Sequence, residues 1–185
     1  MAILTAVCIV EDLRRDPGYF GVTAIDKRAQ AGRVKVTRYG LRGDVQADRK
    51  HHGGIDKALY AYSAEDAAFW EHELGRELPA GWFGENLRIE GLDVNAARIG
   101  ETWAIGDTVT VEVTMPRSPC QTFARWVGDT IGRDAEKGWV KRFAAERRLG
   151  PYLRVTHTGS IAVGDEVRVL SIPDGAPTVA EVFQP

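Results

Sequence analysis

The sequence predicts a mostly β protein, a β-barrel interrupted by a few helices. Short segments alternate apolar and polar residues, as in residues 34–37, which is the pattern of a half-buried strand. Residues 104–111 and 162–169 are similar to each other, since each places a Gly-Asp turn before an alternating strand. Two such hairpins are typical of a small barrel. Apolar residues spaced three or four positions apart, the pattern of an amphipathic helix, occur in only a few stretches of the sequence.

The first half of the chain alternates predicted strands with polar connections. Residues 3–10 are almost wholly apolar and predict a buried strand that opens the fold. A second strand runs over residues 34–40, and the polar, Gly-rich segment 43–56 follows it. Residues 58–62 return to a composition typical of a strand. We therefore expect three strands before the first helix.

Two segments predict the main helices. Residues 63–74 begin with the capping sequence Ser-Ala-Glu-Asp, and Gly75 is suited to end the helix. Residues 134–147 carry an apolar stripe, with Gly138 as a weak point. Between them, the Gly-punctuated loop 81–86 leads into another short strand. We expect strands to hold more residues than helices.

The chain length predicts one domain, which we place at residues 1–171, followed by a peripheral tail at residues 172–185. Three prolines mark this tail, in which Val179 and Val182 are the residues expected to pack. No apolar stretch approaches the ~20 residues of a membrane-spanning helix, and residues 1–10 carry no basic charge typical of a signal peptide. We expect a soluble protein that contacts no membrane.

Charge and cysteine usage exclude several classes of protein. The 24 basic and 26 acidic residues are nearly balanced, so no basic field would attract nucleic acid. Cys8 and Cys120 lie in unlike contexts, an apolar strand and a Pro-flanked loop, which argues against a disulfide framework. A reducing, cytoplasmic location is therefore expected, with no nucleic-acid partner.

The segment Pro116-Arg117-Ser118-Pro119-Cys120 is the most informative of the chain. Ser118 is a suitable N-cap and Pro119 suits the first helical position, which predicts a helix that runs to Gly128. Cys120 would lie in its first turn, where the helix dipole and Arg117 favour a thiolate, the form that binds metals and attacks electrophiles. Cys8 fits the alternative role of a buried packing residue.

The sequence His51-His52-Gly53-Gly54 is the second unusual segment. Two glycines allow a loop backbone to approach a ligand closely and to offer N–H groups to an anion. The same pattern also occurs in ordinary turns with solvated imidazoles, so both interpretations remain open. The nearby Asp48 could orient an imidazole or cap a turn.

These motifs together resemble the MOSC domain family, in particular its stand-alone bacterial members of the YiiM type. The resemblance runs through residues 43–60, through the Phe83-Gly84-Glu85-Asn86-Leu87 sequence and through residues 116–120. A closing segment around residues 142–165 is similar as well. The resemblance implies a barrel similar to that of pyruvate kinase, with helical insertions.

The resemblance also implies a cofactor and a reaction. In this family a cysteine binds the molybdenum of the molybdenum cofactor, a pyranopterin dithiolene, and Cys120 matches it. The residues implied to bind the cofactor are Arg117, Asn86, Arg154, Gly53, Gly54 and Asp48. Family members with an assigned activity reduce N-hydroxylated compounds, so the expected substrate is a small molecule, with His51 or His52 as proton donors.

Some features of longer relatives are missing from this sequence. Two cysteines cannot supply the four thiolates of a usual iron–sulfur cluster, and the sequence holds no dinucleotide-binding glycine motif. A reductase of this kind would take electrons from a separate protein. Pyridoxal phosphate, which belongs to another domain of molybdenum-cofactor sulfurases, is not expected.

Three other functions remain open. Cys120 could carry a persulfide sulfur or hand over the cofactor without turnover, and the same thiolate environment would serve such a carrier. A zinc site from His51, His52 and Cys120 is disfavoured because adjacent histidines rarely point the same way. A cysteine hydrolase is disfavoured because no third member of a triad is apparent.

Overall fold

The computed structural model describes residues 1–18, 21–47 and 53–184. The strands are β1 (Ala2–Arg15), β2 (Val22–Ala29), β3 (Val34–Thr37), β4 (Gly40–Leu41), β5 (Leu59–Ser63), β6 (Leu87–Glu90), β7 (Thr102–Ile105), β8 (Val109–Pro116), β9 (Pro151–His157), β10 (Gly159–Ile161) and β11 (Glu166–Ser171). The helices are α1 (Ala64–Leu74), α2 (Gln121–Thr130), α3 (Arg133–Glu136), α4 (Trp139–Glu146), α5 (Val179–Val182) and the 3-10 helix η1 (Ile55–Lys57). Strands hold more residues than helices, as expected.

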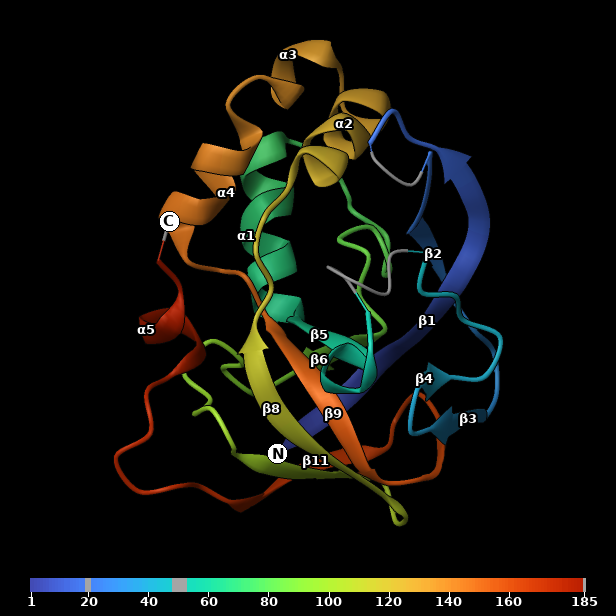
Figure 1. Ribbon diagram of the computed structural model, residues 1–185, viewed down its shortest axis with the longest axis vertical. Coiled ribbons are helices and arrows are strands. Elements are labelled where there is room, and N and C mark those ends of the chain that lie inside the picture. Colours follow the sequence, from blue (N-terminus) through green and yellow to red (C-terminus); the bar gives the residue numbers. More distant parts are fainter. Residues whose placement is uncertain (19–20, 48–52, 185) are drawn as a thin grey trace.

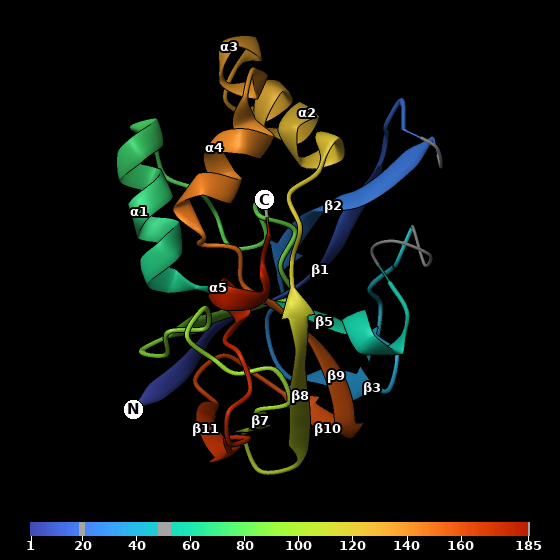
Figure 2. The ribbon, with the colours of Figure 1, turned by 60° about the vertical axis from the view of Figure 1, so that its left-hand side comes forward.

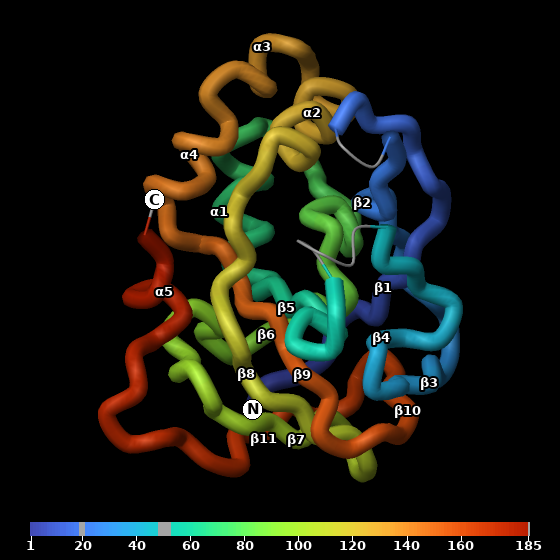
Figure 3. The backbone as a smooth tube through the Cα atoms, viewed as in Figure 1, coloured from blue at the N-terminus to red at the C-terminus, as the bar shows by residue number. Residues whose placement is uncertain are grey.

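Seven strands close into a barrel in the order β11-β7-β8-β9-β5-β6-β1 (Figure 1). β1 completes the ring through the pairs Ala2 with Val167 and Ile3 with Glu166, and the tube in Figure 3 shows the N-terminus beside β11. β2 extends the sheet beyond β1, while β3, β4 and β10 form a separate small sheet. The predicted mostly β barrel is therefore confirmed.

Figure 2 shows α1, α2, α3 and α4 gathered at one end of the barrel. The Ser63 hydroxyl accepts a hydrogen bond from the Asp66 N–H at 3.0 Å, and Gly75 ends α1 in a left-handed conformation. Both signals of this helix are confirmed. The prediction of a single helix over residues 134–147 is wrong. This segment forms two helices, α3 and α4, which are separated at Gly138, where φ is 72°.

The two Gly-Asp segments have different structures. Residues 104–111 form the expected hairpin, in which Ile105 of β7 pairs with Val109 of β8. The hairpin predicted at residues 162–169 is wrong, since β10 pairs with β3 and β11 pairs with β7 and β1. The Asp165 carboxylate caps its own turn and forms an ion pair with Arg33, and the turn is hydrogen-bonded to the Leu4 backbone. This turn therefore joins two sheets.

The apolar side chains form two clusters. One fills the barrel and includes Leu4, Leu59 and Trp103, none of which is exposed. The other is aromatic, with Trp70, Phe123 and Phe143 beneath the helices. Burial of such rings stabilises a fold by ~1.5–3 kcal/mol each. The aromatic cluster therefore anchors the helices to the barrel.

The segment after residue 171 contacts both apolar clusters, through Val179 and Phe183. Thr178 and Glu181 form a capping box at the start of α5, and Val179 is fully buried, as expected. The expectation for Val182 is wrong, because its side chain is exposed and Phe183 is buried instead. Among the described residues, none of the helices has the length and apolar character needed to cross a membrane.

Candidate functional site

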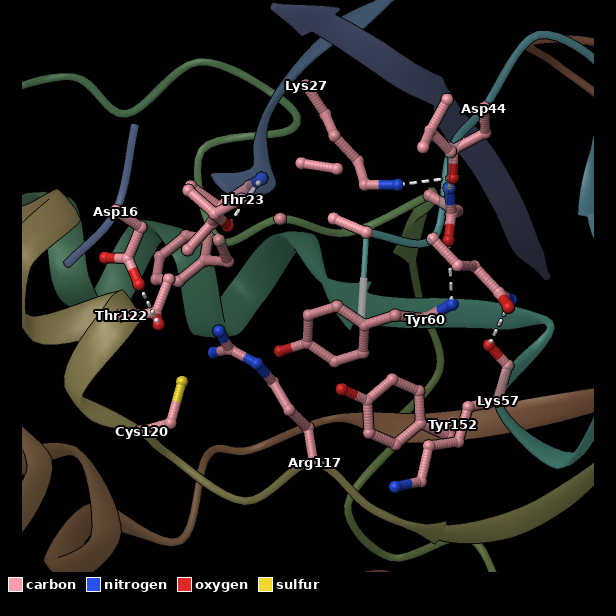
Figure 4. Close-up of a pocket in the computed structure, with 18 of the residues that line it drawn as sticks. Asp16, Thr23, Lys27, Asp44, Lys57, Tyr60, Arg117, Cys120, Thr122 and Tyr152 are labelled. Carbon is pink, nitrogen blue, oxygen red and sulfur yellow. Dashed lines mark hydrogen bonds and ion pairs between the residues drawn. The ribbon is translucent and has the colours of Figure 1, made fainter. Parts of the chain in front are cut away.

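A cavity of about 220 Å³ lies between the start of α2, strands β2 and β5, and the loop at residues 44–47 (Figure 4). The cavity wall includes Asp16, Lys27, Asp44, Asn86, Arg117 and Cys120. These residues come from five separate parts of the chain. The fold therefore brings together side chains that are far apart in the sequence.

Cys120 is the N-cap residue of α2, with an extended backbone at φ −139° and ψ 168°. Its carbonyl accepts the first helical hydrogen bond, from the Ala124 N–H at 3.1 Å. The predicted start at Ser118 is therefore wrong by two residues, and the predicted end at Gly128 is also wrong, since α2 continues to Thr130. The half-buried thiol still lies at the positive end of a helix, which favours its thiolate form.

Arg117 lies three residues before Cys120 and is almost fully buried, with 6% of its surface exposed. Its guanidinium lies over the Phe123 ring, 4.2 Å from the ring centroid, and 5.2 Å from that of Tyr60. Burial acts to lower the pKa of Arg117, but the neighbouring Tyr60 and Cys120 outweigh it and raise the pKa. Within the described chain, its Nη1 atom is buried without a hydrogen-bond partner. Such a donor is costly unless a ligand accepts from it.

Asn86 connects three segments of the cavity wall. Its Oδ1 accepts from the Tyr60 N–H at 3.1 Å, and its Nδ2 donates to the Cys8 carbonyl at 3.1 Å and to Asp44 Oδ2 at 2.7 Å. Asp44 also accepts from the Val10 N–H at 2.9 Å and forms an ion pair with Lys27. This network links β1 and β5 to the loop that carries Asp44, and it keeps the Lys27 charge at the cavity.

Asp16 connects the end of β1 to the first turn of α2. Arg125 donates two hydrogen bonds to its carboxylate, at 2.7 and 2.8 Å, and Thr122 donates one at 3.1 Å. The hydrogen bond from Arg125 is the main cause that lowers the pKa of Asp16. The contact fixes the helix turn that follows Cys120.

We expect Asp16→Asn to lower the free energy of unfolding at pH 7 by about 1–3 kcal/mol, because a carboxylate accepts stronger hydrogen bonds from a guanidinium than an amide does. A lowered pKa means that this stabilisation is present above the ordinary aspartate pKa, about 3.9, and is lost as the pH falls through the folded value. Urea unfolding at pH 7 and pH 3 measures it. If Asp16→Asn lowered the free energy of unfolding by the same amount at pH 3 as at pH 7, this expectation would be contradicted.

Two tyrosines complete the aromatic side of the cavity. The Tyr60 hydroxyl donates to the Leu149 carbonyl at 2.7 Å, and burial raises the pKa of this phenol. Tyr152 lies 5.5 Å from Tyr60 between ring centroids. Cys8, in contrast, is fully buried in β1, and burial raises the pKa of its thiol to about 12. Cys8 is therefore a packing residue, as the sequence indicated.

Of the residues predicted for the site, the structure brings Cys120, Arg117 and Asn86 to one cavity. Arg154 is not part of the cavity wall, and it forms ion pairs with Asp56 at 2.8 Å and Glu112 at 3.2 Å. Three further predicted residues lie outside the described part of the chain: Asp48, His51 and His52.

The two glycines predicted for the site, Gly53 and Gly54, precede η1 and are not among the residues that line the cavity. Gly54 has φ 93°, a conformation that favours glycine, and its N–H donates to Gln46 Oε1 at 2.9 Å. This N–H therefore has a partner within the protein. Among the described residues, no group of three or more His, Cys, Asp or Glu side chains could hold a metal ion.

Sequence reasoning missed Lys27, Asp16 and Tyr60 as cavity residues. Lys27 lies in the charged segment Asp26-Lys27-Arg28, which has the composition of a solvated surface. Its burial results from pairing with Asp44. No local signal distinguishes it from its exposed neighbour Arg28.

The fold and the cavity define a class of β-barrel proteins in which a cysteine at a helix start and a buried arginine line one cavity. The sequence matches the family model of the MOSC domain over residues 48–168. Because this match covers more than half of the chain, the protein belongs to the MOSC domain family. Cys120 and Arg117 both fall within the matched range.

Three relatives are similar in sequence. The uncharacterized protein YflK of Bacillus subtilis (strain 168) is 36% identical over 80% of this chain and 64% of its own length. Protein YiiM of Escherichia coli (strain K12) is 38% identical over 53% of this chain and 45% of its own. A protein named Reductase from Gibberella moniliformis (strain M3125 / FGSC 7600) is 30% identical over 82% of this chain and 26% of its own. The matched region therefore spans less than two thirds of each relative.

Two solved structures share the fold. YiiM from Geobacillus stearothermophilus superimposes with a TM-score of 0.76 at 25% identity, covering 98% of this chain and 82% of that one. YiiM from Escherichia coli superimposes with a TM-score of 0.70 at 21% identity, covering 97% and 74%. The agreement covers nearly the whole chain, so the barrel and its helical end are the family architecture.

Proposed function

We propose that this protein binds the molybdenum cofactor at the cavity and reduces N-hydroxylated small molecules with electrons from a separate donor protein. The observation that carries the proposal is the combination of the half-buried Cys120 thiol with the buried Arg117 Nη1, which has no partner in the described chain. A thiolate suits a metal that already has sulfur ligands. A buried guanidinium suits an anionic or polar ligand group.

The residues that line the cavity fit the molybdenum cofactor. Cys120 would bind the metal, and Arg117 would donate a hydrogen bond to an acceptor on the cofactor. Asn86 would help to shape the cavity wall rather than contact the cofactor, because its side-chain amide is already hydrogen-bonded to Tyr60, Cys8 and Asp44. When bound, the cofactor would supply a metal that accepts the substrate oxygen. The cavity is smaller than the ~300 Å³ of typical ligand pockets, so it would enclose only part of the cofactor.

Membership of the MOSC domain family supports cofactor binding, and the relative named Reductase supports the reaction class. The match spans only 26% of that relative, so its activity is carried to this chain as a proposal. His51 and His52 remain predicted proton donors. A protein that retains the cofactor without turnover would be a carrier, the alternative that the Cys120 environment also serves.

The proposal is tested with protein purified from a host that makes molybdenum cofactor. Mass spectrometry of the released small molecules should identify the pterin, and elemental analysis should find molybdenum. Reduction of N-hydroxybenzamidine with a chemical reductant should yield benzamidine. Absence of both the pterin and molybdenum would refute cofactor binding, whereas molybdenum without turnover with any donor would indicate the carrier.

Arg117→Met tests the guanidinium separately from the fold. We expect at least about tenfold weaker cofactor retention, since one charge-assisted hydrogen bond contributes ~1.5–3 kcal/mol. The free energy of unfolding should change by less than about 1 kcal/mol, because Met fills the same aromatic surroundings without a buried, unpaired donor. Arg168→Met, on the exposed part of β11, is the matched control and should behave as the unmutated protein. Equal retention in both variants would remove Arg117 from the site.

A further inference from the structure

Lys27 is a buried ammonium group on the cavity wall. Its side chain is 8% exposed, and the Asp44 side chain with which it pairs is also 8% exposed. Figure 4 shows Lys27 across the cavity from Cys120 and Arg117. Burial of a charged pair costs several kcal/mol per ion before pairing repays it. Such a pair at a cavity wall requires an explanation beyond packing.

The hydrogen bonds around this pair leave Lys27 with unused donors. Asp44 accepts from the Val10 N–H, from Asn86 and from Lys27. A lysine ammonium carries three N–H donors, and within the described residues Asp44 is the hydrogen-bond partner of Lys27. Among the described residues, two of its donors therefore have no protein acceptor and could serve a molecule in the cavity.

Other acids on the described wall are less suited to give up a proton. The Tyr60 hydroxyl is bonded to the Leu149 carbonyl, and burial raises its pKa. Asp16 is held as a carboxylate by Arg125 and Thr122, which lower its pKa. Arg117 does not release its proton in proteins. Lys57 lies toward Tyr152, with its Nζ 5.5 Å from that ring centroid.

We propose that Lys27, held by Asp44, donates a hydrogen bond and then a proton to the oxygen atom of the N-hydroxylated substrate. The inference rests on the proposed reductase function. Reduction of N–OH to N–H breaks the N–O bond, takes up two electrons from the external donor and two protons, and releases water. Lys27 supplies one of these protons to the departing oxygen and recovers it from solvent.

The first test compares Lys27→Arg and Lys27→Met in protein purified with its cofactor. Arginine keeps the charge and the pairing with Asp44, but it does not act as a proton donor. We expect both variants to lose at least about 100-fold in kcat, the effect typical of a general acid, with molybdenum content unchanged. Lys35→Met, exposed on β3, is the control and should retain full turnover. Full turnover in Lys27→Arg would overturn proton donation.

The second test detects contact without relying on turnover. The Lys27 ammonium signal, assigned by its loss in Lys27→Arg, is followed by NMR as N-hydroxybenzamidine is added. We expect it to shift, whereas benzamidine, which has no N-hydroxyl group, should leave it in place. A signal that does not move at saturation overturns the proposal. A shift in a protein that shows no turnover would reject the reductase function while supporting the contact.

Discussion

Cys120→Ser is expected to abolish molybdenum retention and, with it, reduction of N-hydroxylated compounds. Serine is nearly isosteric with cysteine, but its hydroxyl is a poor ligand for a soft metal. Cys120 is only half-buried and serine is similar to it in size, so the substitution should change the free energy of unfolding by less than about 1 kcal/mol. Elemental analysis, turnover with a chemical reductant and a thermal melt measure the three effects.

Cys8→Ser is the matched control, since it makes the same chemical change in the buried strand β1. A hydroxyl in a fully buried site without a hydrogen-bond partner costs ~1–3 kcal/mol. This variant should therefore lose stability and keep its metal. Full metal content together with full turnover in Cys120→Ser would remove the thiolate from the proposed function.

Gly150→Ala is expected to lower the free energy of unfolding by about 3 kcal/mol or more, the range of severe backbone changes. Gly150 has φ 69°, and a Cβ there would lie 2.3 Å from the Ala61 carbonyl oxygen and 3.0 Å from a Tyr60 ring atom. Its own carbonyl accepts the Arg117 N–H at 2.9 Å. The substitution should therefore also displace Arg117 and weaken cofactor retention.

Gly75→Ala separates backbone strain from this clash. Gly75 has a similar φ of 65°. Apart from its neighbours in the chain, however, no described atom lies within 4 Å of the position that a Cβ would take there. We expect it to cost about 1–2 kcal/mol, the usual penalty of a left-handed conformation. Urea unfolding of both variants gives the comparison, and an equal loss in the two would show that close packing at Gly150 is unimportant.

The sequence predicted best those elements that local chemistry determines. Ser63 and Gly75 fix the ends of α1 through hydrogen bonds within a few residues, so both could be recognised. The turn at Asp165 could not, because its strands choose partners through contacts with Arg33 and the Leu4 backbone. Two similar turn sequences therefore produced a hairpin in one place and a link between sheets in the other.

The same division applies to the site. Cys120 and Arg117 share one short segment with a capping pattern, so the sequence indicated them together. Asp16 contacts Thr122 across 106 residues of sequence, and no pattern within either segment predicts the contact. The Lys27 pair with Asp44 likewise depends on β2 meeting a loop. The shared position of Cys120 and Arg117 at one cavity was predictable from a local motif, whereas the wall opposite them depends on tertiary structure.

Closure of the barrel has a consequence for synthesis on the ribosome. The ring is completed by pairing of Ala2 and Ile3 with Val167 and Glu166, so the two strand edges that meet there are more than 160 residues apart in the sequence. Contacts of such long sequence separation form slowly. We expect β1 to wait with an unpaired edge while most of the chain is translated. A chaperone that shields this edge would therefore raise the yield of folded protein more than it would change its final stability.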